Sequence, residues 1–222
     1  MNVDITPVGD TPQAPNIVIP EDTQSGPMIL DRHATDGSEV THFRISKIAN
    51  GTLFHNDGIT SINNGAYITV SEGQLGLRFQ PTLESSVPGS FVVESSEDGT
   101  TIAAQSGMAT AIITVTSVND APILDNAGTM TLTDVLKDSI NPAGNAVASV
   151  ISSASGNRIT DADPSAIEGI AAIGVDDTNG KWEYSTDSGV SWQSFMANGV
   201  SHASTDDTAA VLLGETAGGG LG

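Results

Sequence analysis

The sequence predicts an all-β chain made of tandem β-sandwich repeats, and three observations lead to this prediction. A β-branched strand followed by Val, a small residue, Asp, any residue and Pro occurs at residues 5–12 and again at residues 115–122. The aspartates of the two copies, Asp10 and Asp120, are about 110 residues apart, which is the length of one small β-domain. Short β-branched segments bounded by Gly, Asn and Asp follow one another, and none of them has helical periodicity. A period of this kind indicates an array of similar modules.

The repeated pattern divides the chain into three parts. Residues 1–12 are predicted to be the end strand of a preceding repeat, and residues 13–122 are predicted to form one complete repeat. Residues 123–222 are predicted to form a second β repeat that is truncated at its C-terminus, because it has no second copy of the closing strand with its Asn-Asp-x-Pro end.

The strands of the first repeat are predicted from alternating and β-branched segments. They are Asn16–Ile19, His42–Ile48, Gly51–Phe54, Ala66–Val70, Leu75–Phe79, Ser90–Glu94 and Ala109–Val118. The pairs Asn50-Gly51 and Asn64-Gly65 predict type I′ turns. Several short strands at this spacing favour a β-sandwich.

The second repeat begins with a less patterned insert, residues 134–156. The strands predicted after it are Ile159–Asp163, Gly169–Val175, Lys181–Ser185 and Ser191–Phe195. Residues 185–192 fit the Asp-box pattern Ser-x-Asp-x-Gly-x-x-Trp, which is known from sialidases. In this motif the Asp accepts backbone N–H groups across a hairpin turn and the Trp packs over the hairpin. The four arginines of the chain are scattered, so a structural role is predicted for the motif and no enzymatic activity is expected.

The charge of the chain restricts its partners. Seven basic residues face 27 acidic residues, which gives a formal net charge of −20. Such a surface repels nucleic-acid phosphates and anionic lipids and attracts cations, so no nucleic-acid partner is expected. The longest apolar stretch, around Ala109 to Val118, is too short to span a membrane, so direct membrane insertion is not expected either. The chain contains no cysteine, which excludes disulfides, thiolate metal sites and cysteine nucleophiles.

Five short motifs accompany the repeat: Val118-Asn119-Asp120-Ala121-Pro122, Pro20-Glu21-Asp22-Thr23, Ala34-Thr35-Asp36-Gly37, Thr160-Asp161-Ala162-Asp163, and Ser90-Phe91-Val92-Val93 leading to Glu97-Asp98-Gly99. Residues 1–122 resemble the cadherin-like repeats of large bacterial surface adhesins, of the repeat-in-toxin and biofilm-associated kinds. The segment from Ile159 through Trp192 is similar to another repeat type common in bacterial giant adhesins. The resemblance implies Ig/cadherin-like Greek-key β-sandwiches joined in tandem outside the cell, with calcium bound between neighbours.

The resemblance also implies a set of calcium ligands. Its positions fall on Glu21, Glu84, Asn119, Asp120, Asp161 and Asp163, with Asp36 and Asp98 as a second tier. The chemistry agrees, because Ca²⁺ takes six to eight oxygen ligands from carboxylates, amides and backbone carbonyls. Ser117 and Ala121 stand where animal cadherins have an acid and a second Asn, so one or two ions are expected at the junction in place of three. Each single Asp also has a structural interpretation as a turn former.

These observations predict a non-enzymatic structural and adhesive segment of a secreted or cell-surface bacterial adhesin. Its partners are expected to be the neighbouring repeats of the same chain, with host or matrix glycans or homotypic contacts as further possibilities. One alternative is a carbohydrate-binding module that uses the aromatic residues of the second repeat, namely Trp182, Tyr184, Trp192 and Phe195. Core packing around the Asp-box hairpin is the favoured interpretation of these aromatics. Another alternative is a spacer domain of a secreted hydrolase.

Overall fold

The computed structural model describes residues 8–103, 106–195, 210–215 and 220–221. The chain divides into two compact units, Met1–Asn119 (unit 1) and Asp120–Gly222 (unit 2), which we describe separately. Most of the regular structure consists of β-strands, so the predicted all-β class is confirmed. Among the residues that the structure describes, no helix is long and apolar enough to cross a membrane.

The larger sheet of unit 1 has five strands in the order β1-β8-β7-β2-β5. Its members are β1 (Ile17–Pro20), β2 (His42–Ala49), β5 (Tyr67–Thr69), β7 (Gly89–Ser96) and β8 (Ala109–Thr116). The two inner pairs, β8 with β7 and β7 with β2, are antiparallel, whereas β1 runs parallel to β8 with Pro20 opposite Thr116. The end of β1 therefore lies beside the end of β8, where the chain leaves the sheet.

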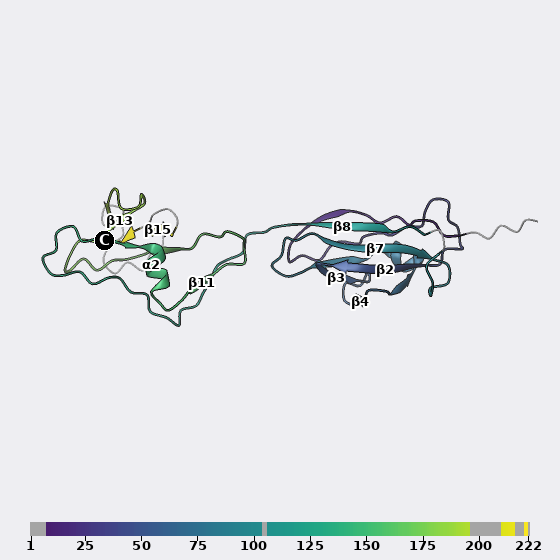
Figure 1. Cartoon of the computed structure of the whole chain (residues 1–222), viewed down its shortest axis with the longest axis horizontal. Helices are drawn as coiled ribbons and strands as arrows, with labels where there is room; N and C mark the ends of the chain where they lie inside the picture. Colours follow the sequence, from purple (N-terminus) through teal and green to yellow (C-terminus); the bar gives the residue numbers. More distant parts are fainter. Residues whose placement is uncertain (1–7, 104–105, 196–209, 216–219, 222) are drawn as a thin grey trace, which may run out of the picture. The chain divides into compact units, whose positions relative to one another are not determined.

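The smaller sheet of unit 1 has three strands in the order β4-β3-β6, formed by β3 (Gly51–Phe54), β4 (Ser61–Ile62) and β6 (Arg78–Pro81). In Figure 1 the strands of both sheets lie roughly along one common axis. Alternate residues of the strands point inward, as the period of two in a strand requires. Phe43 and Phe91 of the larger sheet and Phe79 of the smaller one are fully buried and belong to a single core.

A short helix in unit 1 corrects the prediction that the first repeat contains strands alone. Helix α1 (Val70–Leu75) begins at a capping box in which the Thr69 hydroxyl accepts the Glu72 N–H and the Glu72 carboxylate accepts the Thr69 N–H. Gly76, with φ 91°, follows as the C-cap residue. The strand predicted at Leu75–Phe79 therefore begins only at Arg78. The Thr-x-x-Glu signature of a helix N-terminus was present in the sequence.

The two Asn-Gly pairs of unit 1 do not form the predicted type I′ turns. That turn needs a positive φ at both central residues. Only Asn50 (φ 55°) has one in the first pair, and only Gly65 (φ 89°) has one in the second. Both pairs connect strands of different sheets, so their backbone conformation is set by the crossover and no tight hairpin forms.

Unit 2 is built from shorter strands. A four-stranded sheet has the order β10-β16-β13-β14, and two-stranded sheets pair β11 with β9 and β12 with β15. The bounds are β9 (Ile123–Leu124), β10 (Asn145–Ala146), β11 (Ile159–Thr160), β12 (Gly169–Ala172), β13 (Glu183–Ser185), β14 (Gln193–Ser194), β15 (Val211–Gly214) and β16 (Gly220–Leu221). The less patterned insert, residues 134–156, in which no strand or helix was predicted, contains β10 and a second helix, α2 (Val147–Ser152). Helix α2 has no side-chain cap and buries Val147, Val150 and Ile151.

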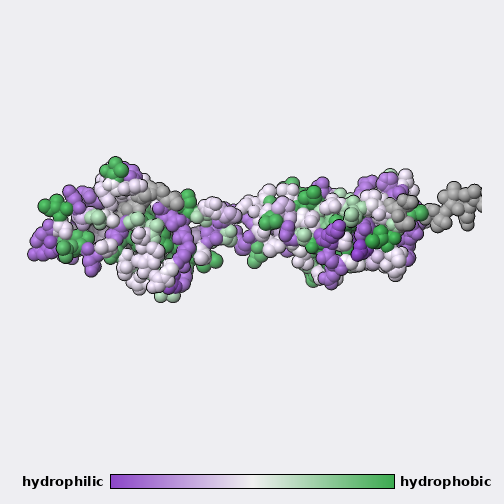
Figure 2. Space-filling view, in the orientation of Figure 1, coloured by the Kyte–Doolittle hydropathy of each residue, from purple (hydrophilic) through white to green (hydrophobic). Residues whose placement is uncertain are grey.

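The core cluster of unit 2 consists of Val147, Ile151, Tyr184, Phe195 and Leu213. Several large apolar side chains of this unit remain at its surface, among them Leu136 (81% exposed) and Ile140 (88% exposed). Figure 2 shows such hydrophobic residues in green, scattered among polar ones on the visible face of each unit.

Candidate metal centre

The end of unit 1 at which the chain leaves β8 carries Glu21, one of the predicted ligands. The backbone N–H of Glu21 donates to the carbonyl of Thr116 (2.9 Å), which continues the β1–β8 pairing by one residue. Its carboxylate Oε1 accepts the N–H of Val118 at 2.8 Å. The parallel pairing of β1 with β8 thus positions Glu21 beside the segment that leads to Asn119 and Asp120.

Glu21 is a buried carboxylate, only 6% exposed. Burying a charge is costly unless it is paired with an opposite charge or binds a metal. Within the described part of the chain no lysine or arginine forms an ion pair with it. A bound cation would supply the compensation that a basic side chain supplies elsewhere.

Asp22 and Glu84 form an acidic pair at the same end of unit 1. The Glu84 N–H donates to Oδ1 of Asp22 at 2.9 Å, and the two carboxylates have oxygens within 4.8 Å of each other. Both residues have a left-handed backbone, with φ 57° at Asp22 and φ 52° at Glu84. Non-glycine residues in this conformation are strained, and such strain is concentrated at functional sites.

Asp22 was not among the predicted ligands. The available signal was its position in the acidic opening Pro20-Glu21-Asp22-Thr23, directly after Glu21. What the sequence could not supply was the contact with Glu84, which comes from a loop 62 positions away.

In unit 2 the predicted ligands Asp120, Asp161 and Asp163 lie together. The N–H of Asp120 donates to Oδ2 of Asp163 (2.8 Å), and the N–H of Asp163 donates to Oδ1 of Asp161 (2.9 Å). Carboxylate oxygens of Asp120 and Asp163 lie within 4.8 Å of each other. The Asp-x-Asp segment thus folds back on the residue that begins unit 2, and it offers the oxygen ligands that Ca²⁺ prefers.

The same contact recurs at the other end of unit 1. Asp10 is the linker aspartate of the first copy of the repeated pattern, and its N–H donates to both carboxylate oxygens of Asp36, at 3.0 and 3.2 Å. Asp36 therefore corresponds to Asp163, and Ala34 stands where unit 2 has Asp161. In both units a linker aspartate donates its amide to the carboxylate of the Asp-x-Asp position.

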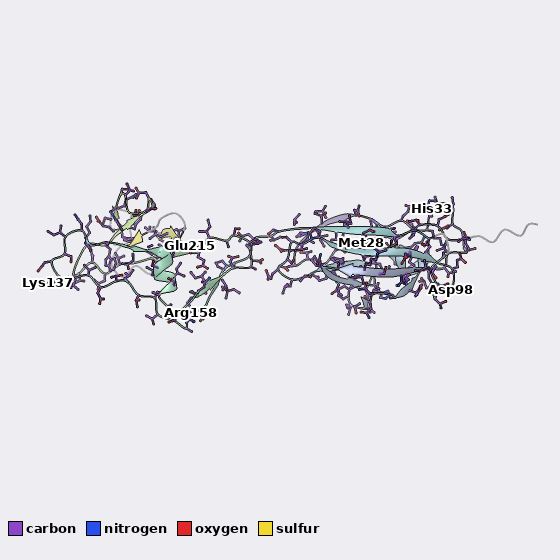
Figure 3. The ribbon with its side chains drawn as sticks, viewed as in Figure 1. Met28, His33, Asp98, Lys137, Arg158 and Glu215 are labelled. Atoms are coloured by element: carbon purple, nitrogen blue, oxygen red, sulfur yellow. The ribbon has the colours of Figure 1, made fainter. Side chains whose placement is uncertain are left out.

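Asp36 and Asp98 do not belong with Glu21 and Glu84. Strand β8 has eight residues, and at about 3.4 Å per residue it separates the two ends of unit 1 by about 27 Å. Figure 3 shows Asp98 and His33 together at one end of unit 1, with Met28 nearer its middle. The second-tier residues therefore lie at the opposite end of unit 1 from the predicted junction.

Asp98 caps a turn. Its carboxylate accepts the N–H groups of Thr100 (2.7 Å) and Thr101 (2.8 Å), followed by the hydroxyl of Thr101 at 3.0 Å. These bonds, with that of Thr100 N–H the strongest cause, hold the pKa of Asp98 well below its usual range. The turn role that the sequence allowed for single aspartates is the one that Asp98 has.

The Asp-box of unit 2 has the predicted structural geometry. Asp187 Oδ1 accepts the N–H of Ser191 at 2.8 Å and the hydroxyl of Ser185 at 2.7 Å. Hydrogen bonds from Ser191, first through its hydroxyl and then through its backbone, lower the pKa of Asp187 from 3.8 to about 2. A Cβ placed on Gly189 would lie 3.6 Å from the ring of Trp192, so the Trp packs over the hairpin.

The aromatic residues of unit 2 divide into two groups. Tyr184 and Phe195 are buried and their rings lie 4.9 Å apart, so the core interpretation is correct for this pair. Trp182 is partly buried against the same core and donates its Nε1–H to the carbonyl of Asp176 (2.7 Å). Trp192 is 37% exposed.

Comparisons with known proteins add little. No protein-family model matches the chain, and no curated protein matches it. A solution NMR structure of residues 27–141 of a conjugate transposon protein from Bacteroides vulgatus is similar, with 13% sequence identity. The alignment covers 51% of this chain and 90% of that chain, with a TM-score of 0.33. A similarity at this level carries no argument about fold or function.

Proposed function

We propose that this chain is a non-enzymatic structural and adhesive segment of a secreted or cell-surface bacterial adhesin. In this proposal its units are Greek-key, Ig/cadherin-like repeats, and calcium at the junction between them makes the stalk rigid. The observation that carries the proposal is the repeated contact of a linker aspartate amide with an Asp-x-Asp carboxylate, Asp10 with Asp36 and Asp120 with Asp163. A contact that recurs at the start of both units is what tandem modules with equivalent linkers require.

The proposed ligands belong to both units, which meet in the sequence at the peptide bond between Asn119 and Asp120. Glu21, Asp22 and Glu84 gather where the chain leaves unit 1. Asp163 contacts Asp120, the first residue of unit 2, and Asp161 in turn contacts Asp163. Asn119 and Asp120 are consecutive in the chain, so the two acidic groups are covalently tethered. Carboxylates that repel one another without a metal would share one or two calcium ions, and the shared ions would fix the orientation of the units.

Calcium should raise the melting temperature of the full chain, and EDTA should reverse the rise. Extracellular sites of this kind have Kd values of about 10⁻⁴ to 10⁻³ M, so the titration must reach millimolar calcium. At a concentration tenfold above Kd the gain is about 1.4 kcal/mol, which corresponds to several degrees for a domain of this size. Small-angle scattering should also show elongation when calcium is added.

Matched variants locate the site. Asp163→Asn and Glu21→Gln should each weaken calcium binding about tenfold or more, because each removes a charged ligand. Asp134→Asn removes the same charge from an exposed position outside the proposed ligand set, so it should leave the affinity unchanged. No thermal response to millimolar calcium, or equal effects of Asp134→Asn and Asp163→Asn, would contradict the calcium junction.

A second candidate function is carbohydrate binding, which the exposure of Trp192 on a rigid hairpin favours. An exposed indole face held in place is suited to stacking on a sugar ring. A glycan array should then give specific signals that Trp192→Ala abolishes while the thermal stability is kept. Trp182→Ala is the contrasting variant, because its indole packs against the core and its loss should lower stability.

A further inference from the structure

The chain contains four Asn-Gly pairs, and the three that the structure describes lie in different surroundings. In such a pair the unhindered backbone nitrogen of the glycine can attack the side-chain carbonyl carbon of the asparagine. Three pairs, Asn50-Gly51, Asn64-Gly65 and Asn179-Gly180, lie in the described part of the chain, and Asn198-Gly199 lies outside it. All three described asparagines are exposed, so exposure does not distinguish them.

Hydrogen bonds anchor the two pairs of unit 1. Asn64 Oδ1 accepts the N–H of Ile48 (2.8 Å), and the attacking amide of Gly65 donates to the carbonyl of Ile45 at 2.7 Å. Bringing the two reacting atoms of this pair together would break both bonds.

The Asn50 pair is anchored in a different way. The Asn50 Nδ2 group donates to the carbonyl of Pro88 at 2.8 Å. Gly51 is fixed in strand β3, packed so closely against the ring of Phe79 that a Cβ would not fit. Neither the side chain nor the glycine backbone of this pair can turn without disturbing the sheet crossover.

The third pair is held only at its flanks. Asp176 accepts the N–H of Thr178 (2.9 Å) with its carboxylate and the Trp182 indole N–H with its carbonyl. At the tip of this turn the Gly180 N–H has only a long contact of 3.4 Å with the carbonyl of Asp177. Within the described residues the Asn179 side chain forms no hydrogen bond, and a Cβ at Gly180 would meet nothing within 4 Å.

We propose that Asn179 is a site of spontaneous deamidation in the folded protein. The Gly180 nitrogen, after losing its proton to solvent base, forms a bond to the side-chain carbonyl carbon of Asn179. The carbon–nitrogen bond of the amide breaks and ammonia leaves. Water then opens the resulting succinimide at one of its two carbonyl carbons, which gives aspartate or isoaspartate at position 179. The product carries an additional negative charge next to Asp176 and Asp177.

The test incubates the folded full chain at mildly alkaline pH and follows each Asn-Gly pair by peptide mapping and mass spectrometry. The same chain in denaturant gives the reference rate for each pair. Position 179 should convert in the folded chain within a few-fold of its reference rate. Positions 50 and 64 should convert about tenfold or more below theirs, because each needs hydrogen bonds to break first. Cleavage after Lys181 separates the Asn198 pair, which is scored separately.

Gly180→Ala provides the control, because the space around Gly180 accepts a methyl group and its φ is not positive. This variant should keep the thermal stability of the chain, slow conversion at position 179 and leave positions 50 and 64 unchanged. Protection of position 179 in the folded chain would overturn the proposal. Conversion of position 50 or 64 at its reference rate in the folded chain would do so as well.

Discussion

The two units reach their folds with very different cores. Unit 1 places seventeen buried residues in one cluster between sheets whose main strands, β2, β7 and β8, are eight residues long. The core cluster of unit 2 has five residues among those described, and its longest described strands, β12 and β15, have four. Since buried apolar area is the main favourable term in folding, unit 1 should be much the more stable of the two.

Local polar contacts take a larger part in unit 2. The hydrogen bonds of Asp187 and the ion pair of Arg158 with Asp125 (2.6 Å) fix turns that have few buried apolar side chains beneath them. Such contacts fix local geometry but contribute little net stability where solvent reaches them. The stability added by a ligand that binds only the folded state should therefore be a larger fraction of the total stability of unit 2 than of unit 1.

The largest effect is expected from Phe195→Ala. Truncating a fully buried Phe costs about 3–5 kcal/mol, which is comparable with the whole stability of a small domain. Unit 2 should therefore unfold while unit 1 stays folded, which two-dimensional NMR would show as the loss of one set of dispersed signals. Phe91→Ala in unit 1 should lower its melting temperature without unfolding it. If Phe195→Ala left unit 2 folded, the proposed difference in core strength would be wrong.

The next effect concerns packing inside unit 1. A Cβ at Gly89 would collide with the ring of Phe79, so Gly89→Ala should cost about 1–3 kcal/mol through overpacking. Gly26→Ala is the matched control, because nothing lies within 4 Å of its Cβ position. Denaturant unfolding of the two variants should differ in midpoint. Equal midpoints would show that the sheets around Phe79 are not tightly packed.

The helix caps give a smaller effect of opposite sign in the two units. Thr69→Ala removes the cap of α1 and should destabilise unit 1 by about 1 kcal/mol, whereas Thr69→Ser keeps the hydroxyl and most of the stability. Helix α2 starts at Ala146 without a side-chain cap, so Ala146→Ser should stabilise unit 2 by about 0.5–1 kcal/mol. Calorimetry of the two transitions would measure both changes. A loss of stability on Ala146→Ser would contradict the assigned helix start.

The smallest effect is the acid sensitivity of the Asp187 hairpin, because this carboxylate is exposed to solvent. Its pKa falls from 3.8 to about 2 on folding, so its stabilising contribution is complete above pH 3.8 and is lost as the pH falls towards 2. Asp187→Asn should therefore lower the melting temperature of unit 2 at neutral pH, and the difference from the wild type should shrink below pH 3.8. A difference that does not change with pH would rule out the charge of Asp187 as its cause.

Prediction from sequence succeeded where the signal was local. Gly51–Phe54 was predicted with the bounds of β3, and β2 and β8 were found to within two residues, because alternation marks a strand that has one buried face. The predicted geometry of the Asp-box was also correct, because all its hydrogen bonds lie between residues 185 and 191. Helix α1 was missed because a six-residue helix is too short to show periodicity, although its capping box was readable.

The candidate site shows the same division. The sequence was enough to predict that Asp10 and Asp120 hold the same place in one repeated pattern, that Glu21 stands in an acidic segment, and that 27 acidic residues face seven basic ones. The contact of Glu84 with Asp22, and the place of Asp36 at the opposite end of unit 1 from Glu21, could be seen only in the folded chain. This difference arises because a repeated motif consists of residues that are adjacent in the chain, so it can be recognised without the fold. A ligand set depends on which strand ends meet, and that is fixed by pairings such as β1 with β8, between residues almost a hundred positions apart.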